Sequence, residues 1–189
     1  MIISQRYSRM FSDASPHPPL IAHVIYRLDV GGLENGLVNI INRLPEDRYR
    51  HVIISLTEVS DFRQRITRKD VDCIALHKRP GNDVRMLWKL WCLFRELRPA
   101  IVHSRNLAAL EAQLPAWLAG VSCRIHGEHG RDIDDIDGTR RKYRWIRRLY
   151  RPLVHRYIPL SRELREYLHT QVGVADKRIS LISNGVDVE

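Results

Sequence analysis

The sequence predicts an α/β fold: a Rossmann-like parallel sheet with helices on both of its faces. Apolar runs rich in β-branched residues alternate along the 189-residue chain with segments of helical period, and this alternation is typical of strands joined by crossover helices. The runs are apolar throughout rather than at every second position, as expected for strands covered on both faces. Polar and glycine-rich clusters follow the ends of several runs, which is where such sheets bind ligands.

Strands and helices are expected to alternate from residue 20 onward. Strands are expected at 20–26, 51–56, 71–76, 100–103, 123–127, 155–160 and 178–182, and helices at 33–44, 61–69, 84–94, 107–118, 139–151 and 164–168. Pro45, Pro99 and Gly120 mark helix ends, and Gly173 resembles a helix C-cap.

Residues 20–182 are expected to form one domain, with 1–19 as a disordered tail and 183–189 as the start of a linker. The tail lacks the apolar region of a secretory signal, and the longest apolar run, 114–121, falls far short of the roughly 20 residues of a membrane helix. The three cysteines are far apart and fit neither a disulfide framework nor a metal-binding spacing. These features predict a cytoplasmic protein.

The net charge of +9 belongs to one segment. Between Thr139 and Arg162 there are nine Lys or Arg residues and no acid, which leaves 22 basic and 22 acidic residues elsewhere. The helix expected there carries seven cations: Arg140, Arg141, Lys142, Arg144, Arg147, Arg148 and Arg151. With Trp145 among them, it is typical of a helix that binds an anionic membrane surface. The alternatives are a solvated basic face and nucleic-acid binding, which no recognised motif accompanies.

Four polar clusters are expected to meet at the carboxyl edge of the sheet. They lie at 31–32, 103–106, 127–131 and 161–162. Gly31 and Gly32 would expose backbone N–H groups at a helix N-terminus, which attracts anions. The alternative is a plain turn that needs a left-handed residue. Glu34, in the first turn of that helix, is expected to be structural.

The stretches 29–34, 98–104, 127–130 and 182–187, in this order, resemble the N-terminal domain of the retaining GT-B glycosyltransferases, specifically those of the group-4 (GT4) family. The strings 105–107 and 128–132 are most similar to sugar transferases of exopolysaccharide clusters associated with PEP-CTERM/exosortase protein sorting. Asn184 and Gly185 would lie in the family's interdomain hinge. The resemblance implies the acceptor-side half of a GT-B enzyme, inactive alone, with a donor-binding second domain outside these 189 residues.

The resemblance also implies partners and roles. The donor would be a nucleotide sugar, and the acceptor a polyprenyl-linked glycan or a polysaccharide at the inner face of the cytoplasmic membrane, with no metal or other cofactor. Gly31 and Gly32 would approach the donor diphosphate, and His129 would border the donor sugar as the candidate catalytic residue. Catalysis would rest on positioning and on stabilisation of the leaving phosphate charge, without a protein nucleophile.

The other candidate substrate-binding residues have structural alternatives. His103 is either a ligand or a satisfied strand-end histidine. Arg105 indicates an acidic or phosphorylated acceptor or a linker diphosphate, and a surface salt bridge would explain it equally. Asn106 belongs to the same cluster, and Arg131 would orient a phosphate or an acidic sugar. Ser161 opens a helix, where N-capping alone would explain a serine.

Two other interpretations stay open. Asp132, Asp134, Asp135 and Asp137 have the D-x-D spacing of metal-dependent transferases, although a solvated acidic loop is the better explanation. Besides a transferase, the chain would suit a non-catalytic basic module that binds anionic membrane or nucleic acid. A dinucleotide-binding oxidoreductase is the least favoured class, because the glycines do not match G-x-G-x-x-G and only Glu58 lies near the end of the second strand.

Overall fold

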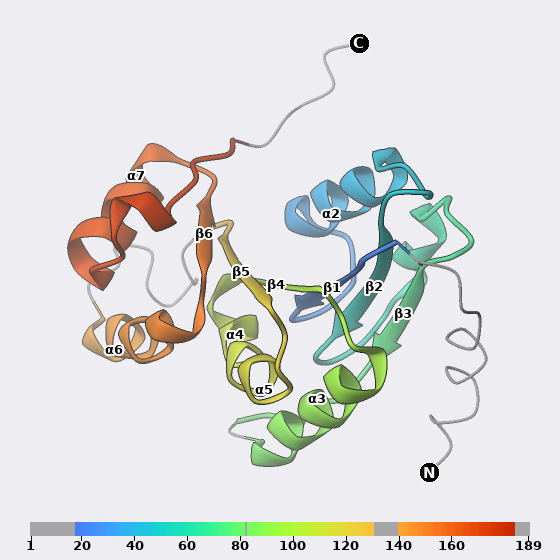
Figure 1. Cartoon of the computed structure of the whole chain (residues 1–189), viewed down its shortest axis with the longest axis horizontal. Helices are drawn as coiled ribbons and strands as arrows, with labels where there is room; N and C mark the ends of the chain where they lie inside the picture. The colour runs from blue at the N-terminus through green and yellow to red at the C-terminus, as the bar shows by residue number, and fades with distance from the viewer. Residues whose placement is uncertain (1–17, 82, 131–139, 184–189) are drawn as a thin grey trace.

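The computed structural model describes residues 18–81, 83–130 and 140–183 of the chain. Within them, six strands form one parallel sheet in the order β3-β2-β1-β4-β5-β6 (Figure 1). The strands are β1 (Leu20–Ile25), β2 (Arg50–Ser55), β3 (Asp72–Ala75), β4 (Ile101–Arg105), β5 (Cys123–Glu128) and β6 (Arg156–Pro159). This is the doubly wound Rossmann order, whose direction reverses between β1 and β4. The predicted fold class is confirmed.

The helices connect these strands in sequence. They are α2 (Gly32–Arg43), α3 (Val84–Leu97), α4 (Asn106–Leu110), α5 (Gln113–Leu118), α6 (Arg141–Tyr150) and α7 (Arg162–Glu166). Shorter elements are the 3-10 helices η2 (Asp61–Arg65), η4 (Arg151–Leu153) and η6 (Asp176–Arg178) and the π-helical turn η5 (Tyr167–Val172). Gly173 caps η5 with φ of 79°, as its position predicts.

Helices cover both faces of the sheet because the central strands are apolar on both faces. On one face, α3 and α5 pack on strand residues such as Ala22 and Val102. On the opposite face, α2 packs on Ile25 and Ile53, and Figure 1 shows α2 and α3 on opposite sides of the central strands. Tyr157 of β6 centres a third cluster with α4 and η5. These layers fix the carboxyl ends of β1, β4, β5 and β6 at one edge.

Three expected elements differ from the structure. The strand expected at 178–182 is reduced to a single bridge between Tyr157 and Ile179. The helix expected at 107–118 is two helices, α4 and α5, because Pro115 has no N–H to donate to the carbonyl of Glu111. The helix expected at 61–69 ends at Arg65, since the Asn42 side chain bonds both the Arg65 carbonyl and the Thr67 N–H.

Candidate functional site

The start of α2 lies at the point where the strand order reverses. Gly31 is extended, with φ of −170°, and no side chain caps the helix. Neither Gly31 nor Gly32 has a positive φ, so a left-handed turn does not explain the pair. A Cβ at position 31 would instead lie 2.2 Å from Oε2 of Glu34. Glu34 therefore folds back over the positive end of the helix, as expected, and an incoming phosphate would meet its carboxylate there.

The loops after β4 and β5 are joined by a hydrogen bond. The backbone N–H of His129 donates to Oδ1 of Asn106 over 2.8 Å. Asn106 has φ of 57°, a left-handed conformation that asparagine tolerates better than most residues. A Cβ at Gly127 would lie 2.8 Å from His129 Nε2 and 3.2 Å from His103 Nε2. Gly127 thus lets both imidazoles approach the backbone of β5, a role that its sequence context did not predict.

Both of these histidines are neutral at pH 7. Burial, followed by the charge of Arg105, holds the pKa of His103 well below its usual range. The same two causes lower the pKa of His129 to about 4. His103 Nε2 and His129 Nδ1 are buried and have no hydrogen-bond partner in the described part of the chain. Both ring nitrogens are therefore buried and unsatisfied within the described residues, which makes each a candidate partner for a ligand hydroxyl that displaces the groups covering it.

Arg105 brings a buried cation to the same place. Its side chain is on β4, only 3% of the residue is exposed, and Nη1 donates to Nδ1 of His23 over 3.2 Å. Burial lowers the pKa of Arg105 to about 10, so it stays protonated at pH 7. Among residues 18–81, 83–130 and 140–183, no carboxylate forms an ion pair with it. The surface salt bridge considered for Arg105 is therefore wrong.

Arg147 is the opposite case, and it corrects the expected basic patch. Only 2% of Arg147 is exposed, because its guanidinium binds both carboxylate oxygens of buried Glu128 over 2.7 and 3.2 Å. Burial alone would raise the pKa of Glu128, but His126 and Arg147 lower it to about 2. Arg147 therefore anchors α6 to β5 and is not part of an exposed surface.

Three further cations of α6 and η4 bind the end of η5. Arg144 donates to Oε1 of Gln171, and Arg148 donates to the Gln171 carbonyl from Nε and Nη2 over 3.0 and 2.8 Å. Arg151 donates to the carbonyls of Val172 and Gly173. Cations at a helix C-terminus satisfy its free carbonyls and complement its dipole. Much of the basic segment thus has a structural role.

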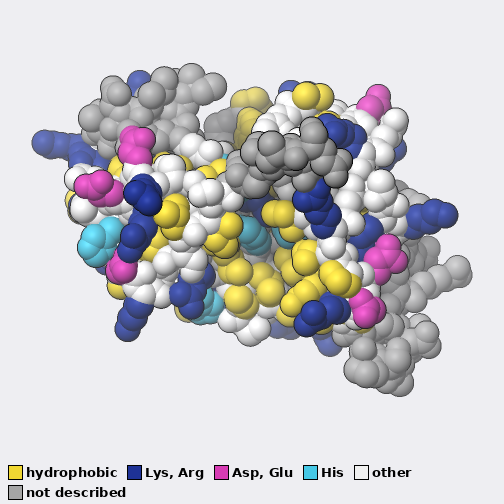
Figure 2. All heavy atoms as spheres, turned by 90° about the horizontal axis from the view of Figure 1, so that it is seen from above, with side chains coloured by type: hydrophobic (Ala, Val, Ile, Leu, Met, Phe, Trp, Pro, Cys, Tyr) yellow, Lys and Arg dark blue, Asp and Glu magenta, His cyan; other side chains and the backbone are white. Residues whose placement is uncertain are grey.

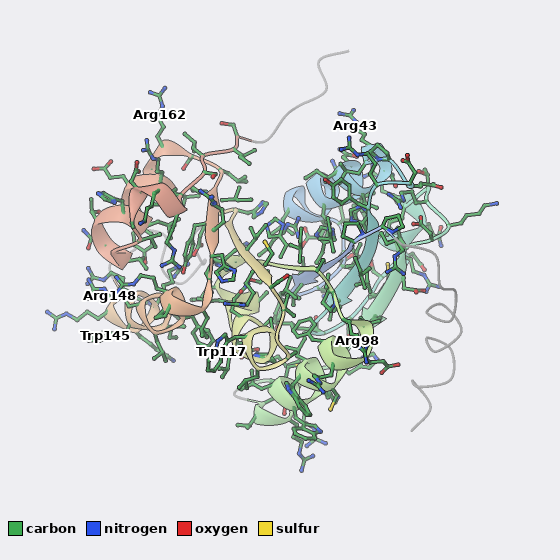
Figure 3. All side chains as sticks on the ribbon, in the orientation of Figure 1. Arg43, Arg98, Trp117, Trp145, Arg148 and Arg162 are labelled. Carbon is green, nitrogen blue, oxygen red and sulfur yellow. The ribbon has the colours of Figure 1, made fainter. Side chains whose placement is uncertain are left out.

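An exposed surface is nevertheless left on α6. Trp145 is 66% and Leu149 73% exposed, and Trp145 and Arg148 project outward from α6 (Figure 3). The Arg148 guanidinium carbon lies 5.8 Å from the centre of the Trp145 ring, a cation–π distance. Arg141 and Lys142, also exposed, begin the same helix, whereas Arg140 directly precedes it.

Of the remaining residues that the sequence singled out, two lie in the part of the chain that the structure describes and the others lie outside it. Ser161 accepts a hydrogen bond from the Leu164 N–H over 3.1 Å and caps α7, so capping explains it. Glu58 is paired with Arg27 over 2.9 Å. Arg131, the acidic run 132–137, Asn184 and Gly185 lie outside the described residues. Within the described ranges there is no cluster of metal-binding side chains and no helix long and apolar enough to cross a membrane.

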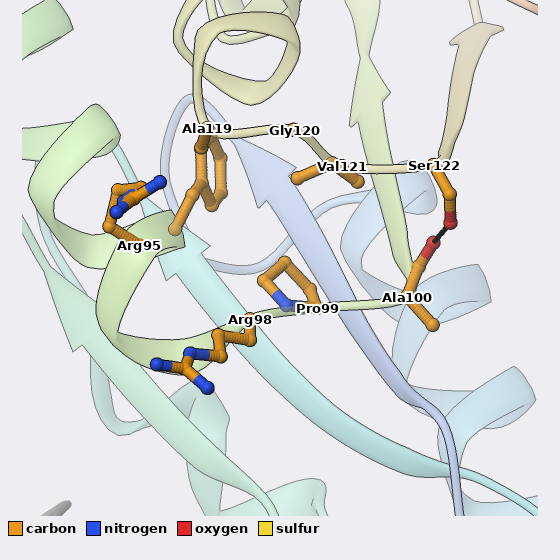
Figure 4. Close-up of a pocket in the computed structure, with 9 residues that line it drawn as sticks. Arg95, Arg98, Pro99, Ala100, Ala119, Gly120, Val121 and Ser122 are labelled. Atoms are coloured by element: carbon orange, nitrogen blue, oxygen red, sulfur yellow. Dashed lines mark hydrogen bonds between the residues drawn. The ribbon is translucent and has the colours of Figure 1, made fainter.

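The two edges of the sheet differ in character. A pocket of about 450 Å³ lies at the amino edge, between the end of α3 and the segment before β5, with Arg95, Arg98 and Ser122 in its lining (Figure 4). No histidine lines it. Figure 2, which views the molecule from above the orientation of Figure 1, shows histidine side chains near the middle of that face, next to hydrophobic side chains. The imidazoles and the unpaired cation identified above belong to the carboxyl edge, which is where doubly wound sheets bind their ligands.

This fold and edge define a Rossmann-like domain of the class that binds nucleotides or other phosphorylated ligands where the strand order reverses. The family model described as Glycosyltransferase Family 4 matches residues 30–189, and the chain belongs to this family. The resemblance to group-4 transferases is confirmed, while the similarity to protein-sorting clusters stays a prediction.

Relatives and solved structures agree with this membership. The UDP-Gal:α-D-GlcNAc-diphosphoundecaprenol α-1,3-galactosyltransferase of Escherichia coli is 31% identical over 114 residues, which are 57% of this chain and 29% of the relative. HepE from Anabaena, solved with UDP and glucose, superposes with a TM-score of 0.66 at 15% identity, over 88% of this chain and 45% of HepE. A glycosyltransferase from Rickettsia africae gives 0.66 at 16% identity, over 89% and 44%. The chain thus spans less than half the length of these proteins, and the structures show the shared fold.

Proposed function

We propose that this chain is the acceptor-side domain of a glycosyltransferase that moves a sugar from a nucleotide sugar to a glycan linked to a lipid diphosphate. Family membership supports the reaction class. The name of the Escherichia coli relative, which acts on a diphosphoundecaprenol-linked sugar, supports the acceptor class. The UDP and glucose bound to HepE support the donor class. Retention of configuration and lack of activity in these 189 residues alone stay predictions.

The observation that carries the proposal is the unpaired cation at the carboxyl edge. Arg105 is buried and charged, and it has no carboxylate partner among the described residues. Burial lowers the pKa of Arg105 and the charge of Glu34 raises it, but Glu34 forms no ion pair with it. A buried charge without a directly bound partner is costly for the fold, so a ligand anion would be a suitable counterion. A diphosphate linker has the required charge, and the guanidinium fork matches two phosphate oxygens.

The neighbouring groups suit the sugar end of the same acceptor. Neutral His129 and His103 each have a buried nitrogen without a partner among the described residues, and this nitrogen would orient a hydroxyl without adding charge once ligand binding exposes it. With the acceptor hydroxyl held there, the enzyme would contribute positioning, and the Arg105 cation would stabilise phosphate charge. The same geometry disfavours a purely basic module, because five cations of the basic segment already bind protein groups: Arg144, Arg147, Arg148, Arg151 and Arg156.

The test is a binding experiment with the full 189-residue chain. A short-chain isoprenyl diphosphate carrying N-acetylglucosamine is titrated in, and backbone NMR shifts are followed. We expect shifts in residues 103–106 and 127–130, and at least tenfold weaker binding in Arg105→Met, since a charge-assisted hydrogen bond is worth about 1.5–3 kcal/mol. Arg95→Met removes the same charge at the amino edge and is the control. Equal affinity of Arg105→Met and wild type, or shifts confined to α6, would overturn the proposal.

A further inference from the structure

Two buried histidines interrupt the apolar face of the sheet under α2. His23 lies on β1 and His51 on β2, with 3% and 2% of each residue exposed. Apolar residues such as Ile25 and Ile53 lie next to them on this face, and His103 of β4 lies beside His23, with ring centres 6.0 Å apart. An imidazole buried in such surroundings costs free energy unless its nitrogens are hydrogen-bonded, and an aliphatic residue would pack there without that cost. The pair therefore calls for an explanation beyond packing.

The hydrogen bonds of this pair end at the candidate site. Nη1 of Arg105 lies 3.2 Å from Nδ1 of His23, and Nε2 of His23 lies 3.0 Å from Nδ1 of His51. The His23 and His51 ring planes are 16° apart. The three side chains thus form one chain of contacts, from the interior of the sheet at β2 to the edge where β4 ends.

The direction of these hydrogen bonds follows from the donor. A guanidinium can only donate, so Nδ1 of His23 must accept and its proton must be on Nε2. His23 then donates to Nδ1 of His51, whose own proton is on Nε2. That last nitrogen has no partner in the described part of the chain. One donor at the edge therefore fixes the tautomers of both histidines.

A neutral acceptor has a consequence that a carboxylate would not have. An aspartate or glutamate at position 23 would also hold Arg105, but it would neutralise the charge. A neutral imidazole fixes the guanidinium and leaves its charge for a ligand. Burial, followed by the Arg105 charge and His51, holds the pKa of His23 well below its usual range, which keeps the acceptor lone pair available near pH 7.

We propose that His23 and His51 are positioning residues that hold the Arg105 guanidinium at the carboxyl edge of the sheet without neutralising it. His23 provides the acceptor for Arg105, and His51 accepts the hydrogen bond from the Nε2 proton that His23 carries in this tautomer. The inference rests on the proposed function for the nature of the ligand, a diphosphate group, but the tautomers themselves do not depend on it.

The tautomers are measured in the ligand-free chain by NMR of ¹⁵N-labelled histidine side chains at pH 7.5. We expect His23 and His51 both to carry their proton on Nε2 and to be neutral. Arg105→Met removes the donor that selects this state, so His23 should then populate both tautomers. A proton on Nδ1 of His23 in the wild-type chain would overturn the inference, whatever the ligand proves to be.

The effect on Arg105 is measured as affinity for inorganic pyrophosphate, by calorimetry on the full chain. We expect His23→Leu to bind at least fivefold more weakly and His51→Leu about twofold more weakly. His23→Gln, whose Oε1 can accept from Arg105, should recover most of the loss. Ile53→Val disturbs packing on the same face without touching the hydrogen bonds, and it should bind as wild type does.

Each outcome of the binding series has a distinct meaning. Equal losses in His23→Leu and Ile53→Val would assign the effect to packing and contradict a positioning role. A wild-type chain that binds neither pyrophosphate nor the lipid-diphosphate probe would contradict the proposed function of Arg105. The positioning inference would in that case be decided by the tautomers alone.

Discussion

The two most deeply buried arginines among the described residues are held in opposite ways. Arg147 and Arg105 are 2% and 3% exposed. Arg147 donates two hydrogen bonds to the Glu128 carboxylate, whereas Arg105 donates one to the neutral imidazole of His23. The Arg147 pair joins α6 to β5. Arg105 lies at the end of β4, where the strand order reverses. Arg147 therefore has a structural role, whereas the charge of Arg105 is available to a ligand.

This difference shows that burial alone does not reveal what an arginine does. Breaking a buried ion pair leaves an uncompensated charge, so the pair holds two elements together even if it adds little net stability. A buried cation without a counterion destabilises the protein until an anion binds. The partner of the guanidinium, and not its exposure, separates the two roles.

The largest expected effect comes from breaking the ion pair. Glu128→Gln removes the carboxylate that binds the buried Arg147 guanidinium and should reduce the free energy of unfolding by about 3–5 kcal/mol, measured by urea denaturation. Arg105→Met, by contrast, removes an unpaired buried charge and should leave stability unchanged or raise it. The comparison fails if both substitutions destabilise the protein equally.

A double-mutant cycle sharpens this result. Arg147→Met should also be strongly destabilising, because it leaves the Glu128 carboxylate buried. The double variant Glu128→Gln with Arg147→Met should lose much less than the sum of the two single changes. Additive losses would show that the two side chains act independently.

The stability contributions of His51, which lies behind Arg105, and of Glu128, which binds Arg147, should be lost at different pH values. The folded-state pKa of His51 is lowered to about 4, with burial and then Arg68 as the causes. Between about pH 6.5 and 4 the unfolded chain therefore binds more protons at this residue, and stability falls as the pH falls. His51 alone should cost about 2 kcal/mol between pH 7.5 and 5. The pKa of Glu128, about 2 in the fold, gives a contribution present above about pH 4.5 and lost only as the pH falls toward 2.

Urea midpoints measured from pH 7.5 to 5 check this separation. His51→Leu should flatten the loss of stability in this range, while Glu128→Gln should leave the slope unchanged and lower the whole curve. An identical slope in wild type and His51→Leu would contradict the neutral buried state of His51.

The fold could be predicted because its signals are local. Apolar runs and helical periods gave the six strands close to their observed bounds, and loop composition placed four polar clusters at the strand ends. The errors came from tertiary hydrogen bonds: Asn42 ends η2 by bonding the backbone of Arg65 and Thr67, which no local pattern indicates. The expected strand at 178–182 has the right composition but makes only one bridge to β6.

The site was predicted less completely, because partners across the sheet cannot be identified from the sequence alone. His103, Arg105 and Asn106 follow one strand and were recognised as a cluster. His23 and His51 lie 28 positions apart inside apolar runs and meet only through the pairing of β1 with β2. Arg147 was grouped with the exposed cations because helical period does not show which turn meets Glu128. Glu128 ends an apolar strand, but four aspartates stand between it and the basic helix, so the sequence did not indicate which acid Arg147 would bind.

The smallest expected effects concern the exposed cations, which form a third class beside Arg147 and Arg105. Arg148 binds the carbonyl at the end of η5, so Arg148→Gln should reduce stability by about 0.3–1 kcal/mol. Lys142 is exposed at the start of α6, and Lys142→Gln should leave stability unchanged.

If the exposed face of α6 binds anionic lipid, both changes should weaken cosedimentation with phosphatidylglycerol vesicles about fivefold, at about 1 kcal/mol per cation. Lys69→Gln, on another surface, should not weaken it. Unchanged vesicle binding in both variants would leave α6 with the structural role alone.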